Sequence, residues 1–313
     1  MIHLCLIGLG GMGKKHFNLL MEIKDVKLTV VDSNIENIRG YSITSDVVFT
    51  NNLNGVCLSL IDAFIIATPL TTRFEILKII ANHKKPIFFE KPFGLNYSHG
   101  LELKSLLQNK NCFVGYPRRF STGINLLKKW ITSQEIDTLL YEANFSQDFQ
   151  KYRPDFASTY YNDYNTGGGF KMDGLNHHFD LVNYLFDADI KVLYSDKKNL
   201  SLPTRDVDDF SISYFKIFGV GLGLVKGNQF QKENEDWAKI TTDKFSLCFD
   251  RISDKLAYQD NDKTSKILYD GNENWTDLLR HQLSAFINVV RNGEVDSRLC
   301  SITDANKILG VFY

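Results

Sequence analysis

The residues with the clearest chemical potential are Asp173, His177 and Asp180, which follow a triple glycine. Their spacing places all three on one face of a helix predicted over residues 167–186. Imidazole titrates near neutral pH, so His177 is suited to take the hydroxyl proton in an alcohol oxidation. A carboxylate beside it, such as Asp173, would fix its tautomer and stabilise the imidazolium. His178 points about 100° away on the same helix and is predicted to be structural.

A glycine turn near the N-terminus predicts where a cofactor binds. An apolar run stops at Gly8 and continues as Gly8-x-Gly10-x-x-Gly13, with helix-like residues after it. Gly8 allows a sharp turn, Gly10 lets a pyrophosphate approach the backbone, and Gly13 lets the helix pack on the strand. The next strand ends in Asp32, which can bind both ribose hydroxyls and would repel a 2′-phosphate. We therefore predict an NAD site, with NADP less favoured, formed by Gly8, Leu9, Gly10, Gly11, Met12, Gly13 and Asp32.

Two further segments are predicted at the same edge of a sheet. Residues 1–120 alternate short apolar strands with helical patterns, which indicates a parallel sheet covered on both faces. Thr68-Pro69 and Glu90-Lys91-Pro92 directly follow two of these strands, and ligands of such sheets bind beyond the strands' carboxyl ends. Most loop lysines are merely solvated, but a lysine at this edge can reach a substrate oxygen. We expect Thr68, Pro69, Glu90 and Lys91 to contact the cofactor, and Lys91 also to bind substrate.

The region after residue 120 predicts a second domain with a binding loop. Short alternating strands between 191 and 259 indicate a meandering sheet with one covered face. The loop 147–166 is long, lacks a predicted structure and is rich in aromatic residues, which is typical of a binding element. In it, Tyr152 and Arg153 are candidate substrate ligands, because an arginine can bind a carboxylate or phosphate through paired hydrogen bonds. The alternative is that the aromatic side chains only fix the loop to the sheet.

Five motifs together resemble the glucose-fructose oxidoreductase / inositol dehydrogenase / MocA-type (Gfo/Idh/MocA) family. They are Gly8-Leu-Gly-Gly-Met-Gly-Lys-Lys-His16, Ala67-Thr-Pro69, Glu90-Lys-Pro92, Gly115-Tyr-Pro-Arg-Arg-Phe120 and Gly167-Gly-Gly-Phe-Lys-Met-Asp-Gly-Leu-Asn-His177. The resemblance spans essentially the whole chain. It departs from the family pattern at Arg73, where a histidine is usual, and at Pro117, where an asparagine is usual.

The resemblance implies an α/β fold with two domains. A Rossmann domain with a doubly wound parallel sheet would occupy residues 1–120, and a helix over 302–312 would pack back on it. An α+β domain with an open, mostly antiparallel sheet would occupy residues 121–301 and bind substrate. The implied activity is NAD(P)-dependent redox chemistry on sugars or cyclitols.

We therefore predict an NAD-dependent dehydrogenase of a sugar derivative. His177 would be the general acid/base, Lys91 would polarise the reacting oxygen, and Asp173 would orient the pair. The loop before Gly167 is similar to that of family members in bacterial surface-glycan pathways, which favours an activated or acidic sugar. A cyclitol or free-sugar dehydrogenase is the first alternative, and an oxidation that initiates elimination also stays open. A non-catalytic cofactor-sensing regulator is the alternative from another class, and the intact chemical residues argue against it.

The composition excludes several other classes of protein. The 313 residues, 43% hydrophobic and 23% charged, predict two globular domains. A net charge of −1 does not favour nucleic acid or an anionic membrane as a partner. Five scattered cysteines without a Cys-x-x-Cys pair indicate reduced thiols and no metal site. Without a predicted signal or membrane span, we expect a cytoplasmic homo-oligomer, a dimer or tetramer formed through the second domain's sheet.

Overall fold

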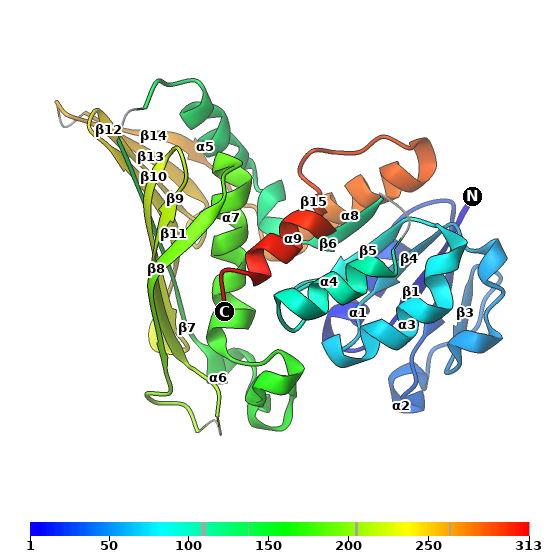
Figure 1. Ribbon diagram of the computed structural model, residues 1–313. Coiled ribbons are helices and arrows are strands. Elements are labelled where there is room, and N and C mark those ends of the chain that lie inside the picture. The colour runs from blue at the N-terminus through cyan, green and yellow to red at the C-terminus, as the bar shows by residue number, and fades with distance from the viewer. Residues whose placement is uncertain (108–110, 137, 204–205, 263, 313) are drawn as a thin grey trace. The chain divides into compact units, whose positions relative to one another are not determined.

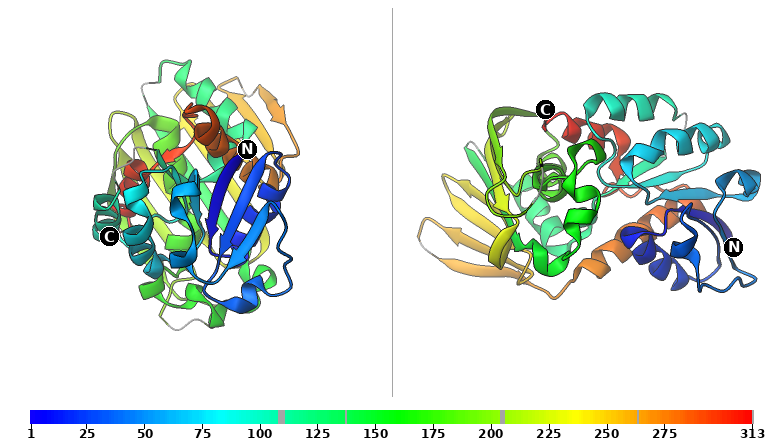
Figure 2. Two further views of the ribbon diagram at one scale, coloured as in Figure 1. Left: turned by 90° about the vertical axis from the view of Figure 1, so that its right-hand side faces the viewer. Right: turned by 90° about the horizontal axis from the view of Figure 1, so that it is seen from below.

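The computed structural model describes residues 1–107, 111–136, 138–203, 206–262 and 264–312, shown as ribbons in Figures 1 and 2. The chain divides into two compact units. Unit 1 contains Met1–Tyr116 and Leu279–Leu309, and unit 2 contains Pro117–Leu278 with the residues from Gly310 onward. The predicted end of the second domain at residue 301 differs from this division, because Cys300–Ser301 pairs with a strand of unit 1.

Unit 1 is built on a seven-stranded sheet with the order β15-β6-β5-β4-β1-β2-β3. Its strands are β1 (Ile2–Ile7), β2 (Val26–Val31), β3 (Val47–Thr50), β4 (Ala63–Ile66), β5 (Ile87–Glu90), β6 (Cys112–Gly115) and β15 (Cys300–Ser301). Strands β1 to β6 are parallel, and β15 joins the edge antiparallel to β6. The order reverses between β1 and β4, which is the switch point of a doubly wound Rossmann sheet. The predicted α/β fold is therefore confirmed.

Helices cover both faces of this sheet. They are α1 (Gly11–Met21), α2 (Ile35–Ile38), α3 (Arg73–Ile80), α4 (Tyr97–Ser105), α9 (Ile302–Leu309) and the part of α8 (Trp275–Asn292) from Leu279 onward. Phe88 of β5 contacts α1 and α8 on one face, whereas its neighbour Phe89 faces Arg73 of α3 on the other. Two covered faces explain why the central strands are buried along nearly their whole length.

The sequence missed β3, which lies in the stretch 33–50 where no periodicity is evident. Only one of its four residues, Val47, is buried. An edge strand this short leaves almost no hydrophobic pattern to recognise. Two separate 3₁₀ turns, Leu53–Gly55 and Leu58–Leu60, follow this strand.

Unit 2 is built on an eight-stranded sheet with the order β14-β13-β12-β11-β7-β10-β9-β8. Its strands are β7 (Leu139–Asp148), β8 (Ile190–Lys198), β9 (Phe210–Ile217), β10 (Gly221–Asn228), β11 (Phe230–Thr242), β12 (Phe245–Asp250), β13 (Lys255–Asp260) and β14 (Ser265–Asp270). All pairs are antiparallel except β7 with β10. This confirms the open, mostly antiparallel sheet.

Two helices cover one face of the unit 2 sheet, α5 (Thr122–Thr132) and α7 (Asn176–Phe186), as Figures 1 and 2 show. Trp130 of α5 packs on Phe245 with ring centroids 4.4 Å apart. Phe179 of α7 packs on Phe215 at 5.7 Å. The strands accordingly alternate buried and half-exposed residues, most regularly in β12.

The loop predicted over residues 147–166 has a structure of its own. Strand β7 runs into it, and α6 (Phe149–Tyr152) is followed by 3₁₀ turns at Phe156–Ser158, Tyr160–Asn162 and Tyr164–Thr166. Phe149, Phe156 and Tyr161 form a small buried cluster with Leu202 and Val207. The expectation of a structureless loop was wrong, because these aromatic side chains fix the loop to the rest of the unit.

Candidate active site

The glycine turn has the geometry expected of a phosphate-binding loop. Gly8 has φ +97°, and a Cβ there would lie 2.6 Å from the carbonyl oxygen of Ala67. A Cβ on Gly13 would lie 2.0 Å from the carbonyl oxygen of Gly8, so the close packing of α1 on β1 requires glycine. A Cβ on Gly10, by contrast, would have no atom within 4 Å. Nothing in the described protein requires glycine at position 10, and an approaching pyrophosphate would explain it.

The start of α1 is left open to an anion. Gly10 caps the helix without a side-chain hydrogen bond, and the first turn holds no acidic residue. Its first N–H groups are therefore available to phosphate, and Met12 lies in this turn. The Thr68 hydroxyl, beside Gly8, is buried without a hydrogen-bond partner among the described residues, and the exposed Pro69 follows it. These observations fit NAD.

Asp32 is held against the glycine turn. Its carboxylate accepts hydrogen bonds from the backbone N–H groups of Leu9, at 2.6 Å, and Asn34, at 2.9 Å, and from Asn37 Nδ2 at 3.0 Å. The bond to Leu9 fixes the acidic side chain beside the turn. Because a carboxylate offers about four acceptor positions, the protein already uses most of them. The Asn37 side chain would have to turn aside for both ribose hydroxyls to bind.

Lys91 lies at the carboxyl end of β5, in the same unit as the glycine turn. Glu90, Pro92, Phe93 and Gly94 are buried, whereas Lys91 between them is half-buried. We call these four buried residues the Lys91 frame. The Glu90 carboxylate lies 2.6 Å from Nε2 of His16 in α1, and both side chains are shielded from solvent.

Asp173 lies in a π-helical turn, Lys171–Leu175, which runs directly into α7. Such turns widen the helix and often occur at functional sites. The widening breaks the α-helical spacing on which the single Asp–His–Asp face was based. The carboxylate of Asp180 binds Arg119 at 2.7 and 3.0 Å in the interior, which gives this residue a structural role.

Of the predicted substrate residues in the loop, Arg153 is linked to Asp173 through Tyr160, and Tyr152 contacts a different residue. The hydroxyl of Tyr160 donates to Asp173 Oδ1 at 3.1 Å and accepts from Arg153 Nη1 at 3.1 Å. Although burial opposes it, the negative charge of Asp173 raises the pKa of Arg153. Tyr152 is largely exposed and accepts a hydrogen bond from Asn234. The positive charge of Arg153 is thus balanced within unit 2.

His177 is buried at the start of α7, and two consecutive arginines hold the residues around it. Its ring packs edge-on against Trp275, with centroids 5.5 Å apart. Arg119 binds Asp180, as described, and Arg118 Nη1 donates to Nε2 of His178 at 2.9 Å. The helix is therefore held at His178 and at Asp180, which are one and three residues after His177.

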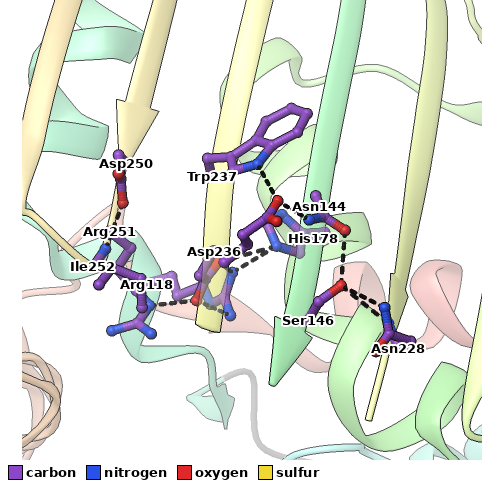
Figure 3. A network of polar contacts seen from close by, with 11 residues as sticks. Arg118, Asn144, Ser146, His178, Asn228, Asp236, Trp237, Asp250, Arg251 and Ile252 are labelled. Carbon is purple, nitrogen blue, oxygen red and sulfur yellow. Dashed lines mark hydrogen bonds and ion pairs between the residues drawn. The ribbon is translucent and has the colours of Figure 1, made fainter. Parts of the chain in front are cut away.

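Figure 3 shows the network into which Arg118 and His178 are built. Arg118 forms two hydrogen bonds of 2.8 Å with Asp236 of β11, and Arg251 binds the same carboxylate. Burial raises the pKa of Asp236, but the two arginines outweigh burial and hold it well below its usual range. Burial, reinforced by Arg118, lowers the pKa of His178 to about 4, so its ring is neutral and accepts from the guanidinium.

The structure thus forms two groups of predicted residues. Gly8 to Gly13, Asp32, Thr68, Pro69, Glu90 and Lys91 belong to unit 1, whereas Tyr152, Arg153, Asp173 and His177 belong to unit 2. Sequence reasoning missed His16 as the partner of Glu90. The available signal was a histidine on the apolar face of α1, since such a residue usually has a buried polar partner.

Among the described residues, no group of three or more histidine, cysteine, aspartate or glutamate side chains is arranged to hold a metal ion. Within the same residues, no helix combines the length and apolar character needed to cross a membrane.

The strand order and the glycine turn define unit 1 as an NAD-binding Rossmann domain. Residues 2–116 match the sequence model described as "Oxidoreductase family, NAD-binding Rossmann fold" (GFO_IDH_MocA). This match confirms the resemblance of residues 2–116 to the Gfo/Idh/MocA oxidoreductases, and NAD as the cofactor of this domain.

Several known proteins are similar to the chain. Scyllo-inositol 2-dehydrogenase (NAD⁺) of Bacillus subtilis is 26% identical over 182 residues, which are 56% of this chain and 51% of that protein. The match thus spans about half of this relative's length. Two solved structures share the fold at 18% identity. Levoglucosan dehydrogenase with NADH has a TM-score of 0.82 over 98% of this chain and 94% of the other. UDP-N-acetylglucosamine 3-dehydrogenase of Acidithiobacillus ferrooxidans has a TM-score of 0.79 over 99% and 95%.

Proposed function

We propose that this protein is an NAD-dependent dehydrogenase that oxidises a CH–OH group of a sugar or cyclitol, or reduces the corresponding ketone. The observation that carries the proposal is the position of Lys91. This half-buried lysine lies between the buried residues of its frame at the strand end of an NAD-binding sheet. The relative that acts on scyllo-inositol supports the same class of substrate.

Three side chains would carry out the chemistry. Bound NAD supplies the carbon that accepts or returns the hydride. The ammonium group of Lys91 would donate a hydrogen bond to the reacting oxygen and stabilise its developing negative charge. His177 would take the hydroxyl proton, and Asp173 would orient the pair.

A screen for NADH formation tests this function. Purified protein would be incubated with NAD and a panel of cyclitols, free sugars, sugar acids and nucleotide sugars. On the accepted substrate, His177→Ala and Lys91→Ala should lower turnover about 10²–10⁴-fold and leave the NAD dissociation constant unchanged. The exposed His281 provides a control, since His281→Ala should retain turnover.

Each contrary result points to a specific alternative. A loss below tenfold for His177→Ala would remove it from the acid/base role. NAD binding without turnover of any substrate would instead favour the cofactor-sensing regulator. Release of an aglycone from a glycoside would show that oxidation initiates elimination.

The cofactor should be NAD rather than NADP. A 2′-phosphate would meet the carboxylate of Asp32, which is fixed by the backbone of Leu9. We expect NADH to bind more tightly than NADPH in a fluorescence titration. Asp32→Ser should reduce this difference in affinity between the two cofactors. Tighter binding of NADPH by the unaltered protein would contradict this assignment.

For the substrate itself, we favour a neutral cyclitol or free sugar over the acidic or activated sugar expected from the sequence. The reason is that Arg153 already donates to Tyr160 and is charge-balanced by Asp173. An arginine reserved for a substrate carboxylate would be expected to lack such a counter-charge. The acidic or nucleotide-linked sugar remains the second candidate, because the remaining N–H groups of Arg153 can still donate.

We further propose that the protein is a cytoplasmic homo-oligomer, a dimer or tetramer, formed through the unit 2 sheet. The face opposite α5 and α7 carries no helix among the described residues of this unit (Figure 1). Tyr194, Tyr214 and Leu224 are register partners in one row across it, and Tyr194 is 59% exposed. Light scattering on the purified protein tests the assembly, and Tyr194→Glu should shift it towards monomer.

A further inference from the structure

Arg73 is a fully buried arginine in unit 1, at the position where the resembled family usually has a histidine. Its side chain is 1% exposed. Nη1 donates to the carbonyl oxygens of Pro92 and Phe93, at 2.5 and 3.0 Å, and the guanidinium lies 6.0 Å from the ring centre of Phe89. Arg73 therefore joins the first turn of α3 to the Lys91 frame.

The charge of Arg73 is retained despite this burial. Desolvation lowers its pKa to about 10, while Glu90 opposes the shift, so the group is still cationic at neutral pH. A buried charge is costly unless it is hydrogen-bonded and has a counter-charge nearby. The carbonyl oxygens of the frame accept hydrogen bonds from Arg73. Glu90, which His16 holds in place, supplies the counter-charge.

Contacts on both sides of Lys91 hold its neighbours, through a side chain before it and through the backbone after it. His16 holds the residue before it, and Arg73 holds the two residues after it. A third bond, from the Leu95 N–H to His99 Nδ1 at 3.1 Å, restrains the following turn. Arg73 lies too deep to meet the cofactor or the substrate directly.

We propose that Arg73 is a positioning residue for Lys91, holding the backbone that presents the lysine and making no contact with NAD. The proposal rests on the catalytic role of Lys91 proposed above. A lysine at position 73 would keep the charge, but its side chain is shorter and lacks the planar guanidinium that directs Nη1 at the carbonyl oxygens of Pro92 and Phe93. It should therefore hold both carbonyls less well.

A double-mutant cycle tests whether Arg73 acts through Lys91. Arg73→Met would be measured alone and together with Lys91→Ala, with Arg73→Lys as the milder variant should the methionine form not fold. We expect Arg73→Met to lower kcat about tenfold or more, since small displacements of a reacting group are costly. In the Lys91→Ala background it should cause no further loss. Arg39→Met, at an exposed arginine of the same unit, is the matched control.

A second readout does not depend on turnover. Hydrogen exchange of the peptide covering residues 90–96 should become faster in Arg73→Met or Arg73→Lys, while the NAD dissociation constant changes less than about twofold. Weaker NAD binding, unchanged exchange, or an equal loss of kcat in both backgrounds would overturn the positioning role. If Lys91→Ala alone retained full turnover, the proposed function of Lys91 would fail, and the exchange result would still decide whether Arg73 holds the frame.

Discussion

Lys91 and His177 are both presented by backbone that buried side chains hold, but the two regions are held differently. Around Lys91, Arg73 of α3 binds carbonyl oxygens and His16 of α1 binds the adjacent carboxylate of Glu90. Around His177, ion pairs join α7 and β11 to two arginines outside both elements. The comparison teaches that the region around Lys91 is held mainly by hydrogen bonds from a buried cation to backbone carbonyl oxygens, whereas the region around His177 is held by buried arginine–aspartate ion pairs.

The largest effect should come from changing the local packing of unit 1. Gly13→Ala places a Cβ 2.0 Å from a backbone oxygen, so we expect loss of soluble protein or a large fall in melting temperature. Gly10→Ala meets no atom within 4 Å and should leave the melting temperature nearly unchanged while weakening NAD binding. Equal thermal effects of the two substitutions would contradict the assignment of Gly10 to the cofactor. Calorimetry and an NAD titration measure both quantities.

Breaking an ion pair of unit 2 should have the next largest effect. Asp180→Asn leaves the buried Arg119 without its counter-charge, which typically costs about 3–5 kcal/mol of unfolding free energy. Asp296→Asn breaks a similar but partly exposed pair with Arg298, for which we expect about 0–1 kcal/mol. Denaturant unfolding would compare them. Equal losses would show that burial of the Arg119 pair has no special importance for α7.

His178 should make the protein sensitive to acid. Its folded-state pKa, about 4, is below the ordinary value of 6.5, so protonation favours the unfolded state as pH falls between these values. The shift corresponds to roughly 3 kcal/mol lost across that window and none above it.

His178→Gln tests this acid sensitivity and keeps an acceptor for Arg118. The variant should lose correspondingly less unfolding free energy between pH 6.5 and 4, with Asp236 and Arg251 unaltered in both proteins. Parallel pH profiles of the variant and the parent would contradict the neutral buried ring.

The smallest effect concerns Arg153 and separates the two substrate classes. If Arg153 only balances Asp173 and holds Tyr160, Arg153→Lys should lower thermal stability and weaken all substrates alike. If it binds a carboxylate or phosphate, KM for the charged sugar should rise about tenfold, or roughly 1.4 kcal/mol, with neutral polyols unaffected. We expect the first pattern, and steady-state kinetics with one charged and one neutral substrate would distinguish them.

The sequence predicted what local geometry determines. The glycine turn, the strands that lead into Asp32 and Glu90, and the helix that follows the triple glycine are all readable, because each depends on neighbouring residues. Arg118 and Arg119 gave no such signal, since their partners are 118 and 61 residues away. The π turn at Asp173 also escaped prediction, because hydrophobic periodicity does not distinguish one widened turn from an α-helix.

The pairing of Arg118 with Asp236 has a consequence for the protein's synthesis. At about 5–20 residues per second, Arg118 is made roughly 6–24 s before its partner 118 residues later. During that interval its charge must stay hydrated, and α7 emerges from the ribosome before the strand that anchors it exists. The network around Arg118 can therefore be completed only after β11 has been made, and the helix bearing His177 lacks this support until then.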